Sequence, residues 1–161
     1  MVRKIISSFL IFLFLSAVFV GIPLVLVFLN NYFNLPIYTN LYFKIFGVTL
    51  FLGGFSVVIY STFLHIKTGR ATPLPVMEQP RKFMVSGFYK YSRNPMYLAE
   101  VFIFLGLFFL LGHILLFLYP MGFFIIINLF VIYIEEPEMR KKFKKQYSEY
   151  TKKVPRWMSG F

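Results

Sequence analysis

Residues 96–136 read MYLAEVFIFLGLFFLLGHILLFLYPMGFFIIINLFVIYIEE, two apolar runs separated only by Gly112 and His113. A helix needs about 20 apolar residues to cross the roughly 30 Å hydrocarbon core of a bilayer. The runs 96–111 and 114–134 are close to that length. Because their connection is so short, the two helices must run antiparallel. We therefore predict a membrane-embedded helical hairpin at the centre of the fold.

Two further apolar runs, 5–29 and 41–64, precede this hairpin. The whole chain is 58% hydrophobic, with a mean hydropathy of +0.71, far outside the range of water-soluble domains. We predict an all-α integral membrane protein with four transmembrane helices and a C-terminal amphipathic helix. It forms one multi-pass membrane domain, 1–161: helices one and two lie in 1–64, and a loop, the hairpin and a C-terminal cap lie in 65–161.

The residues that most often bind metals are scarce. The chain has no cysteine, which excludes disulfides, thiolate nucleophiles and cysteine-based zinc sites. Its two histidines, His65 and His113, lie far apart in sequence and lack the spacing of metal ligands. We therefore expect no metal site.

The cations are unevenly distributed along the chain. Of 17 Lys and Arg residues, 16 precede the first run, lie between the second and third runs, or follow the fourth. Residues 30–40 and the turn at Gly112 carry none, and only Lys44 departs from the pattern. Cytoplasmic loops of membrane proteins are enriched in Lys and Arg. We therefore predict that both termini and the middle loop are cytoplasmic. In a soluble protein a net charge of +11 would suggest a nucleic-acid partner, but the cations here lie beside membrane helices, and we expect none.

Beyond Glu135-Glu136-Pro137, which ends the fourth span, apolar side chains recur at helical spacing. They are Met139, Phe143, Tyr147, Tyr150 and Val154. The opposite face is rich in Lys, so we predict an amphipathic helix that binds anionic lipid headgroups. Its aromatic face either covers a site or contacts lipid.

Charged groups lie at and near the start of the third helix. Arg93 could simply reach lipid phosphates, as Arg often does at a membrane boundary. Glu100 lies two turns inside the helix, where a carboxylate is costly unless it faces a partner or a water-filled cavity. An Arg93–Glu100 ion pair is one interpretation. Closely packed helices are expected at Gly53-Gly54 and Gly106.

The glutamates at the end of the fourth helix need a positive neighbour, because the helix dipole is negative there. Arg140 and Lys141 are close in sequence and could supply it. A bound cationic ligand would serve equally well. The residues alone leave both possibilities open.

Several motifs together resemble the superfamily of isoprenylcysteine carboxyl methyltransferases and phospholipid methyltransferases. They occur in order over residues 65–158: Thr72-Pro73-Leu74-Pro75, Gly87-Phe88-Tyr89, Arg93-Asn94-Pro95-Met96-Tyr97, Glu135-Glu136-Pro137, Tyr147-Ser148-Glu149-Tyr150 and Val154-Pro155-Arg156. Members of this superfamily are helical membrane enzymes that bind S-adenosylmethionine at the cytoplasmic face. The first two helices resemble those of the superfamily only in being apolar membrane helices.

The resemblance implies a set of site residues. Glu136, and less surely Glu135, would hold the methionine ammonium of S-adenosylmethionine. The implied cofactor-binding residues are Gly87, Tyr89, Arg93, Pro95, Tyr97, Glu135, Glu136, Tyr147 and Tyr150. The implied catalytic residues are Arg93, Asn94 and Arg156, with Arg156 a candidate for orienting the methyl acceptor.

Asn94 departs from the family pattern, which has His at this position. Asn forms hydrogen bonds but cannot exchange protons near neutral pH, so it cannot act as a base. We expect methyl transfer to a lipophilic acceptor that enters sideways from the bilayer, with catalysis resting on positioning in a dry site. The competing interpretations are a membrane reductase of the steroid reductase type, using NADPH, and a non-enzymatic membrane binding protein. The sequence does not indicate an oligomeric state.

Overall fold

The computed structural model describes residues 13–67, 83 and 85–158, and this part of the chain is helical and contains no β-strand. The elements in order are the π-turn η1 (Ala17–Gly21), α2 (Ile22–Tyr32), α3 (Leu41–Lys67), the 3₁₀ turn η2 (Gly87–Lys90), α4 (Pro95–Leu111), α5 (Ile114–Phe130), the π-turn η3 (Val131–Glu135) and α6 (Glu136–Lys153). The predicted start of the first helix, 5–12, and the motif at 72–75 lie outside the described residues.

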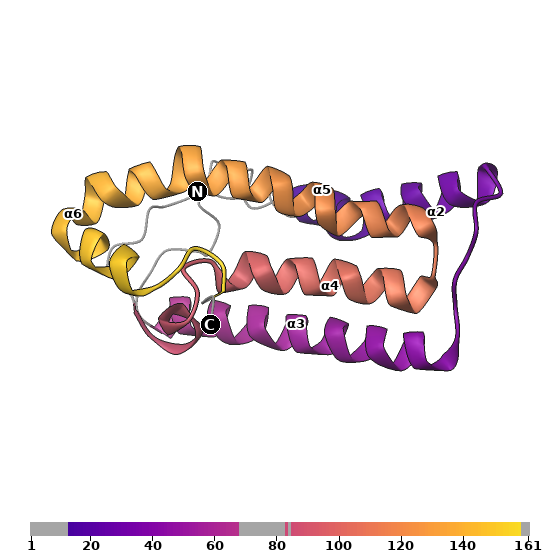
Figure 1. Cartoon of the computed structure of the whole chain (residues 1–161), viewed down its shortest axis with the longest axis horizontal. Coiled ribbons are helices and arrows are strands. Elements are labelled where there is room, and N and C mark those ends of the chain that lie inside the picture. Colours follow the sequence, from indigo (N-terminus) through magenta and orange to yellow (C-terminus); the bar gives the residue numbers. More distant parts are fainter. Residues whose placement is uncertain (1–12, 68–82, 84, 159–161) are drawn as a thin grey trace, which may run out of the picture.

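In the described part of the chain, three helices are long and apolar enough to cross a membrane. They are the continuous helices Leu13–Tyr32, Leu41–His65 and Ile114–Lys153, while α4 is a shorter apolar helix. The apolar part of the last one ends at Ile134. The predicted hairpin is confirmed, since α4 turns at Gly112 directly into an antiparallel α5 (Figure 1).

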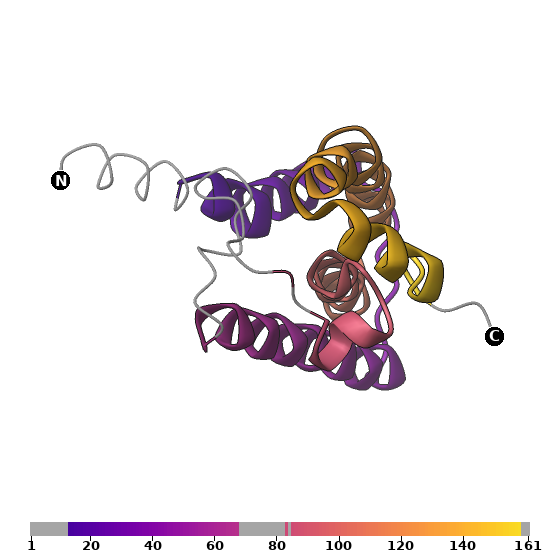
Figure 2. The same cartoon turned by 90° about the vertical axis from the view of Figure 1, so that its left-hand side faces the viewer.

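α4 occupies the middle of the bundle, between α3 and α5, and α2 lies beside α5 (Figures 1 and 2). Glycines permit the close approach of α3 and α4. A Cβ atom on Gly54 would lie 2.6 Å from the carbonyl oxygen of Ala99, and one on Gly106 would lie 2.8 Å from that of Gly47. By contrast, a Cβ atom on Gly53 would meet nothing within 4 Å. Of the predicted packing glycines, Gly54 and Gly106 are therefore confirmed and Gly53 is not.

Both π-turns end two residues before a proline. η1 precedes Pro23 in α2, and η3 precedes Pro137 in α6. A proline ring clashes with the carbonyl group four residues earlier, and a wider π-turn relieves that clash. The chain therefore continues as a helix from α5 through Pro137, instead of breaking where the apolar span ends. This continuation carries Glu135 and Glu136 to the end of the bundle where α4 begins.

α6 bends sharply at Lys144, whose backbone angles are φ 42° and ψ −114°. The predicted single amphipathic helix is therefore wrong in shape, although its apolar face is present. The second arm folds back toward the start of α4 (Figure 1). Tyr147, Tyr150 and Val154 form a buried cluster against Phe83. The aromatic face thus covers protein and not lipid.

The opposite end of the bundle, which we call the turn end, comprises residues 30–40 and 111–115. Asn30 is fully buried there, donating from Nδ2 to the Leu35 carbonyl at 3.0 Å and accepting from the Leu115 N–H at 3.2 Å. The Tyr38 N–H donates to the Gly112 carbonyl at 2.8 Å. Gly112 has φ +74° and packs against Tyr38, a conformation that favours glycine. No charged residue takes part.

Candidate active site

The candidate site lies at the end of the bundle opposite the turn end, which we call the site end. Four segments meet there: η2, the start of α4, the start of α6, and the C-terminal residues 154–158 (Figures 1 and 2). The helical hairpin brings the start of α4 and the end of α5 together. The bend in α6 then returns the C-terminal residues to the same place.

Glu136 is held by two arginines and is only 5% exposed. Its Oε1 accepts from Arg93 Nη1 at 2.7 Å and from Arg156 Nε at 2.7 Å, and its Oε2 accepts from Arg156 Nη2 at 3.1 Å. Arg156 is thus bidentate, the strongest geometry for an Arg–carboxylate pair. These three residues form what we call the Arg–Glu–Arg cluster.

Backbone contacts fix the positions of both arginines. The Arg93 N–H donates to the Pro155 carbonyl at 3.0 Å. The Arg156 carbonyl accepts from the Ser92 hydroxyl at 3.3 Å and from Asn94 Nδ2 at 3.1 Å. Asn94 therefore ties the start of α4 to the C-terminal segment. Its amide orients the backbone of Arg156 in the observed structure.

The electrostatics follow from this pairing. Burial opposes ionisation of Glu136, but the hydrogen bond from Arg156 and the charges of Arg93 and Arg156 together hold its pKa below the ordinary value. The hydrogen bond to Glu136 raises the pKa of Arg156 in turn. Burial, followed by the charge of Glu136, raises the pKa of Tyr147, which lies beside Arg93. At neutral pH the cluster is fully ionised.

Glu135, the neighbouring glutamate, is in a different environment. Its Oε2 is buried and has no hydrogen-bond partner within the described part of the chain, and the same is true of Arg93 Nε. Its carboxyl group interacts with the Tyr97 hydroxyl of α4. Burial raises the pKa of Glu135 to about 7, so a cationic neighbour would stabilise its ionised form. The site thus offers one buried acceptor and one buried donor without partners.

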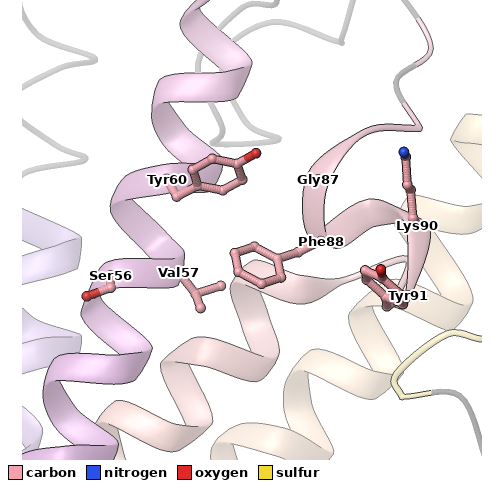
Figure 3. Close-up of a pocket in the computed structure, with 7 residues that line it drawn as sticks. All are labelled: Ser56, Val57, Tyr60, Gly87, Phe88, Lys90 and Tyr91. Atoms are coloured by element: carbon pink, nitrogen blue, oxygen red, sulfur yellow. The ribbon is translucent and has the colours of Figure 1, made fainter.

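The other predicted residues fall on two sides of η2. The Tyr150 hydroxyl donates to the Tyr89 carbonyl at 2.6 Å, so the second arm of α6 is fastened to this turn. Pro95 is buried at the first position of α4. Gly87 lies instead against Tyr60 of α3, where it lines a pocket on the opposite side of η2 (Figure 3).

Two interpretations raised by the sequence can now be judged. Arg93 pairs with Glu136 and not with Glu100. The main counter-charges of Glu136 are Arg93 and Arg156, with Arg140 contributing less. Glu100 lies within α4 in the electrostatic neighbourhood of Tyr97 and Tyr119.

Sequence reasoning missed Ser92 and Phe83. The Ser92 hydroxyl accepts from the Asn94 N–H at 3.1 Å while donating to Arg156, and it is 5% exposed. The signal for it was its position directly before Arg93. Phe83 has no such signal, because its ring becomes important only when α6 folds back onto it.

Comparison with known proteins identifies the family of the chain. A family model described as phospholipid methyltransferase matches residues 42–146. The chain belongs to this family. Neither a curated protein nor a solved structure matches it. As a member of the phospholipid methyltransferase family with apolar membrane-spanning helices, the protein is an integral membrane protein of a methyltransferase family.

The family match includes α4, α5 and much of α3, and within the site it includes Arg93, Glu135 and Glu136. It ends before Tyr147, so the second arm of α6 and Arg156 lie beyond the region matched by the phospholipid methyltransferase family. In this protein, Arg156 nevertheless supplies two of the three hydrogen bonds from arginine to Glu136. The C-terminal segment is therefore part of the site.

Proposed function

We propose that this phospholipid methyltransferase family member transfers a methyl group from S-adenosylmethionine to a lipophilic acceptor. The observation that carries the proposal is a pair of buried atoms, Glu135 Oε2 and Arg93 Nε, that have no hydrogen-bond partner among the described residues and lie within the family's matched region. S-adenosylmethionine carries an ammonium and a carboxylate on its methionine part. A free carboxylate oxygen suits the first, and a guanidinium N–H suits the second.

Glu135 would then hold the ammonium, and Arg93 the carboxylate. Glu136 would act as a positioning residue, because its carboxylate is already taken up by Arg93 and Arg156. Tyr97 would complete the wall beside Glu135. When bound, the cofactor supplies a methyl group activated by its sulfonium.

The remaining site residues would shape and close the pocket. Tyr147 lies beside Arg93, and Tyr150 fastens the turn that contains Gly87 and Tyr89. Pro95 fixes the start of α4. Asn94 holds the backbone of Arg156, a role that needs no proton exchange. Arg156 would orient the acceptor through the part of its side chain that remains exposed.

The acceptor would arrive from the bilayer, between helices whose outer surfaces are apolar. Each methylene group removed from water contributes about 0.8 kcal/mol to such partitioning. We further propose that α4 completes four membrane crossings and that the site end and both termini face the cytoplasm. The exposed lysines of α6 would contact anionic lipid headgroups there.

The decisive experiment is calorimetric titration of the full-length protein in detergent with S-adenosylhomocysteine, which retains the ammonium and the carboxylate. Wild type should bind, and Glu135→Gln should weaken binding by about 1.5 to 3 kcal/mol, the range for a hydrogen bond to a charged group. Glu149→Gln is the control, since Glu149 lies in an exposed pair with Lys145 at 4.0 Å.

Activity requires a second measurement. Transfer of a labelled methyl group to a total membrane lipid extract should yield a labelled lipid with the wild type. Saturable binding of NADPH, with no response to S-adenosylhomocysteine, would replace the proposal with a reductase. Absence of binding to either cofactor would support a non-enzymatic membrane protein.

A further inference from the structure

A cavity lies on the α3 side of η2, away from the Arg–Glu–Arg cluster. Its volume is about 510 Å³, and it is lined by Ser56, Val57 and Tyr60 of α3 and by Gly87, Phe88, Lys90 and Tyr91. Figure 3 shows Val57 and Tyr60 reaching from α3 toward Phe88, with Lys90 and Tyr91 on the far side of the turn. The volume is within the usual range for a small-molecule site.

The lining has two chemical parts. Val57 and the rings of Tyr60 and Phe88 form an apolar wall, and the two rings meet edge to face at 5.4 Å between centroids. Lys90 supplies a cation, and none of the described lining residues carries a carboxylate. Within the described residues Lys90 has no ion pair. A ligand that matches both parts carries a negative charge next to a hydrocarbon segment.

The depth of the pocket indicates the source of such a ligand. Tyr60 lies 19 residues after Leu41, the first residue of α3, which corresponds to about 28 Å along a helix. The hydrocarbon core of a bilayer is roughly 30 Å thick. With Leu41 near one boundary of that core, the pocket lies near the other, where acyl chains meet phosphates. The neighbouring residues Phe55, Ile59 and Phe63 are exposed on α3, as lipid contact requires.

We propose that this pocket binds an anionic phospholipid. The phosphate lies against Lys90 and the Tyr60 hydroxyl, and the first methylene groups of an acyl chain cover Val57 and Phe88. An anionic headgroup such as phosphatidylglycerol matches Lys90, the one cation among the described lining residues, whereas the ammonium of phosphatidylcholine finds no acidic partner among them. The site does not depend on methyl transfer.

The same turn connects this lipid site to the candidate active site. η2 contributes Gly87, Phe88 and Lys90 to the pocket, while its Tyr89 carbonyl receives the hydroxyl of Tyr150 on the other side. Arg93 follows two residues after Tyr91. A bound lipid therefore holds in place the segment from which Arg93 reaches Glu136.

The test is native mass spectrometry of the full-length protein, titrated separately with phosphatidylglycerol and phosphatidylcholine of identical acyl chains. Lys90→Gln should lower the affinity for phosphatidylglycerol about fivefold, the effect expected for one surface cation, and leave phosphatidylcholine binding unchanged. Lys44→Gln, the matched control, removes an exposed cation from the first turn of α3, at the other end of that helix, and should change neither. Val57→Phe fills the apolar part of the pocket and should weaken the binding of both lipids.

Three results would overturn the proposal. Unchanged phosphatidylglycerol affinity in Lys90→Gln would remove the lysine from the site. Equal losses in Lys90→Gln and Lys44→Gln would indicate a general attraction of the basic protein for anionic lipid. Displacement of phosphatidylglycerol by millimolar inorganic phosphate would indicate a site for soluble anions and not for a lipid.

Discussion

The two ends of the helical bundle are closed in different ways. At the turn end, a buried amide and backbone groups satisfy each other, through Asn30 and the Tyr38–Gly112 hydrogen bond. At the site end, closure depends on buried charges, and Glu135 Oε2 and Arg93 Nε lack partners in the described structure. Among the described residues, the turn end has one such atom, Nδ1 of His113.

This difference separates groups that maintain the fold from groups available to a ligand. A neutral amide whose nitrogen and oxygen are both hydrogen-bonded, like that of Asn30, stabilises a connection and offers little to a ligand. A buried carboxylate oxygen without a partner is costly, so it persists in a fold where something else compensates for it. The comparison predicts that changes at the turn end alter stability alone, whereas changes at the site end also alter ligand binding.

The largest effect is expected from Glu136→Gln, which leaves Arg93 and Arg156 facing a neutral amide. Removing one partner of a buried ion pair typically costs 3 to 5 kcal/mol. We expect a loss of about 3 kcal/mol, at the low end because Arg156 is partly exposed. Thermal unfolding in detergent, followed through Trp157 fluorescence, measures it. Trp157 reports this region because its Nε1 donates to Asn128 Oδ1 at 3.0 Å.

The pH dependence of the same variant provides an internal check. The pKa of Glu136 is lowered in the folded state, so its stabilising contribution is present above its ordinary value of 4.5 and is lost as pH falls through the folded pKa. The difference in Tm between wild type and Glu136→Gln should therefore shrink below about pH 4.5. Glu149→Gln, from an exposed pair, should leave Tm nearly unchanged. A constant difference down to pH 3 would contradict the assignment.

A smaller effect is expected where α3 meets α4, between the two ends. Gly54→Ala places a Cβ atom 2.6 Å from the Ala99 carbonyl oxygen, and overpacking of this kind costs about 2 kcal/mol. Gly53→Ala, one residue earlier, faces open space and should change Tm little. The two variants add the same methyl group at adjacent positions. Equal changes in Tm would show that packing at Gly54 does not limit the approach of the helices.

The sequence predicted the parts of the fold that depend on local pattern. The apolar runs gave the helices to within a few residues, and the short link at Gly112 gave the hairpin. The bend at Lys144 was not predictable, because a lysine-rich run has no breaking residue there. The preference of the aromatic face for Phe83 over lipid arises from tertiary contact. The π-turns before Pro23 and Pro137 were not predicted either, because they arise where the helix adjusts to each proline ring.

The candidate site shows the same division. Arg93, Asn94, Glu136 and Arg156 were all identified from motifs, and the structure brings them together. The resemblance ranked Glu136 above Glu135 as the ammonium ligand, and the proposed function reverses that order because Glu136 is already paired with Arg93 and Arg156. No local pattern distinguishes two adjacent residues of one type before their neighbours are known. The pairing of Glu136 with Arg93 joins residues 43 positions apart, a distance that no local pattern specifies.

The smallest effect is expected at the turn end, from Asn30→Ala. The Asn30 side chain accepts from the N–H of Leu115, in the first turn of α5, where helices have no internal partner for such groups. It thus caps a helix from a neighbouring one, and loss of a cap costs about 1 kcal/mol. We expect a lowered Tm of that order and unchanged affinity for S-adenosylhomocysteine, since the change lies at the opposite end from Glu135. Weakened binding in a variant that remains folded would show that the two ends are coupled, and the separation between a structural end and a ligand-binding end would fail.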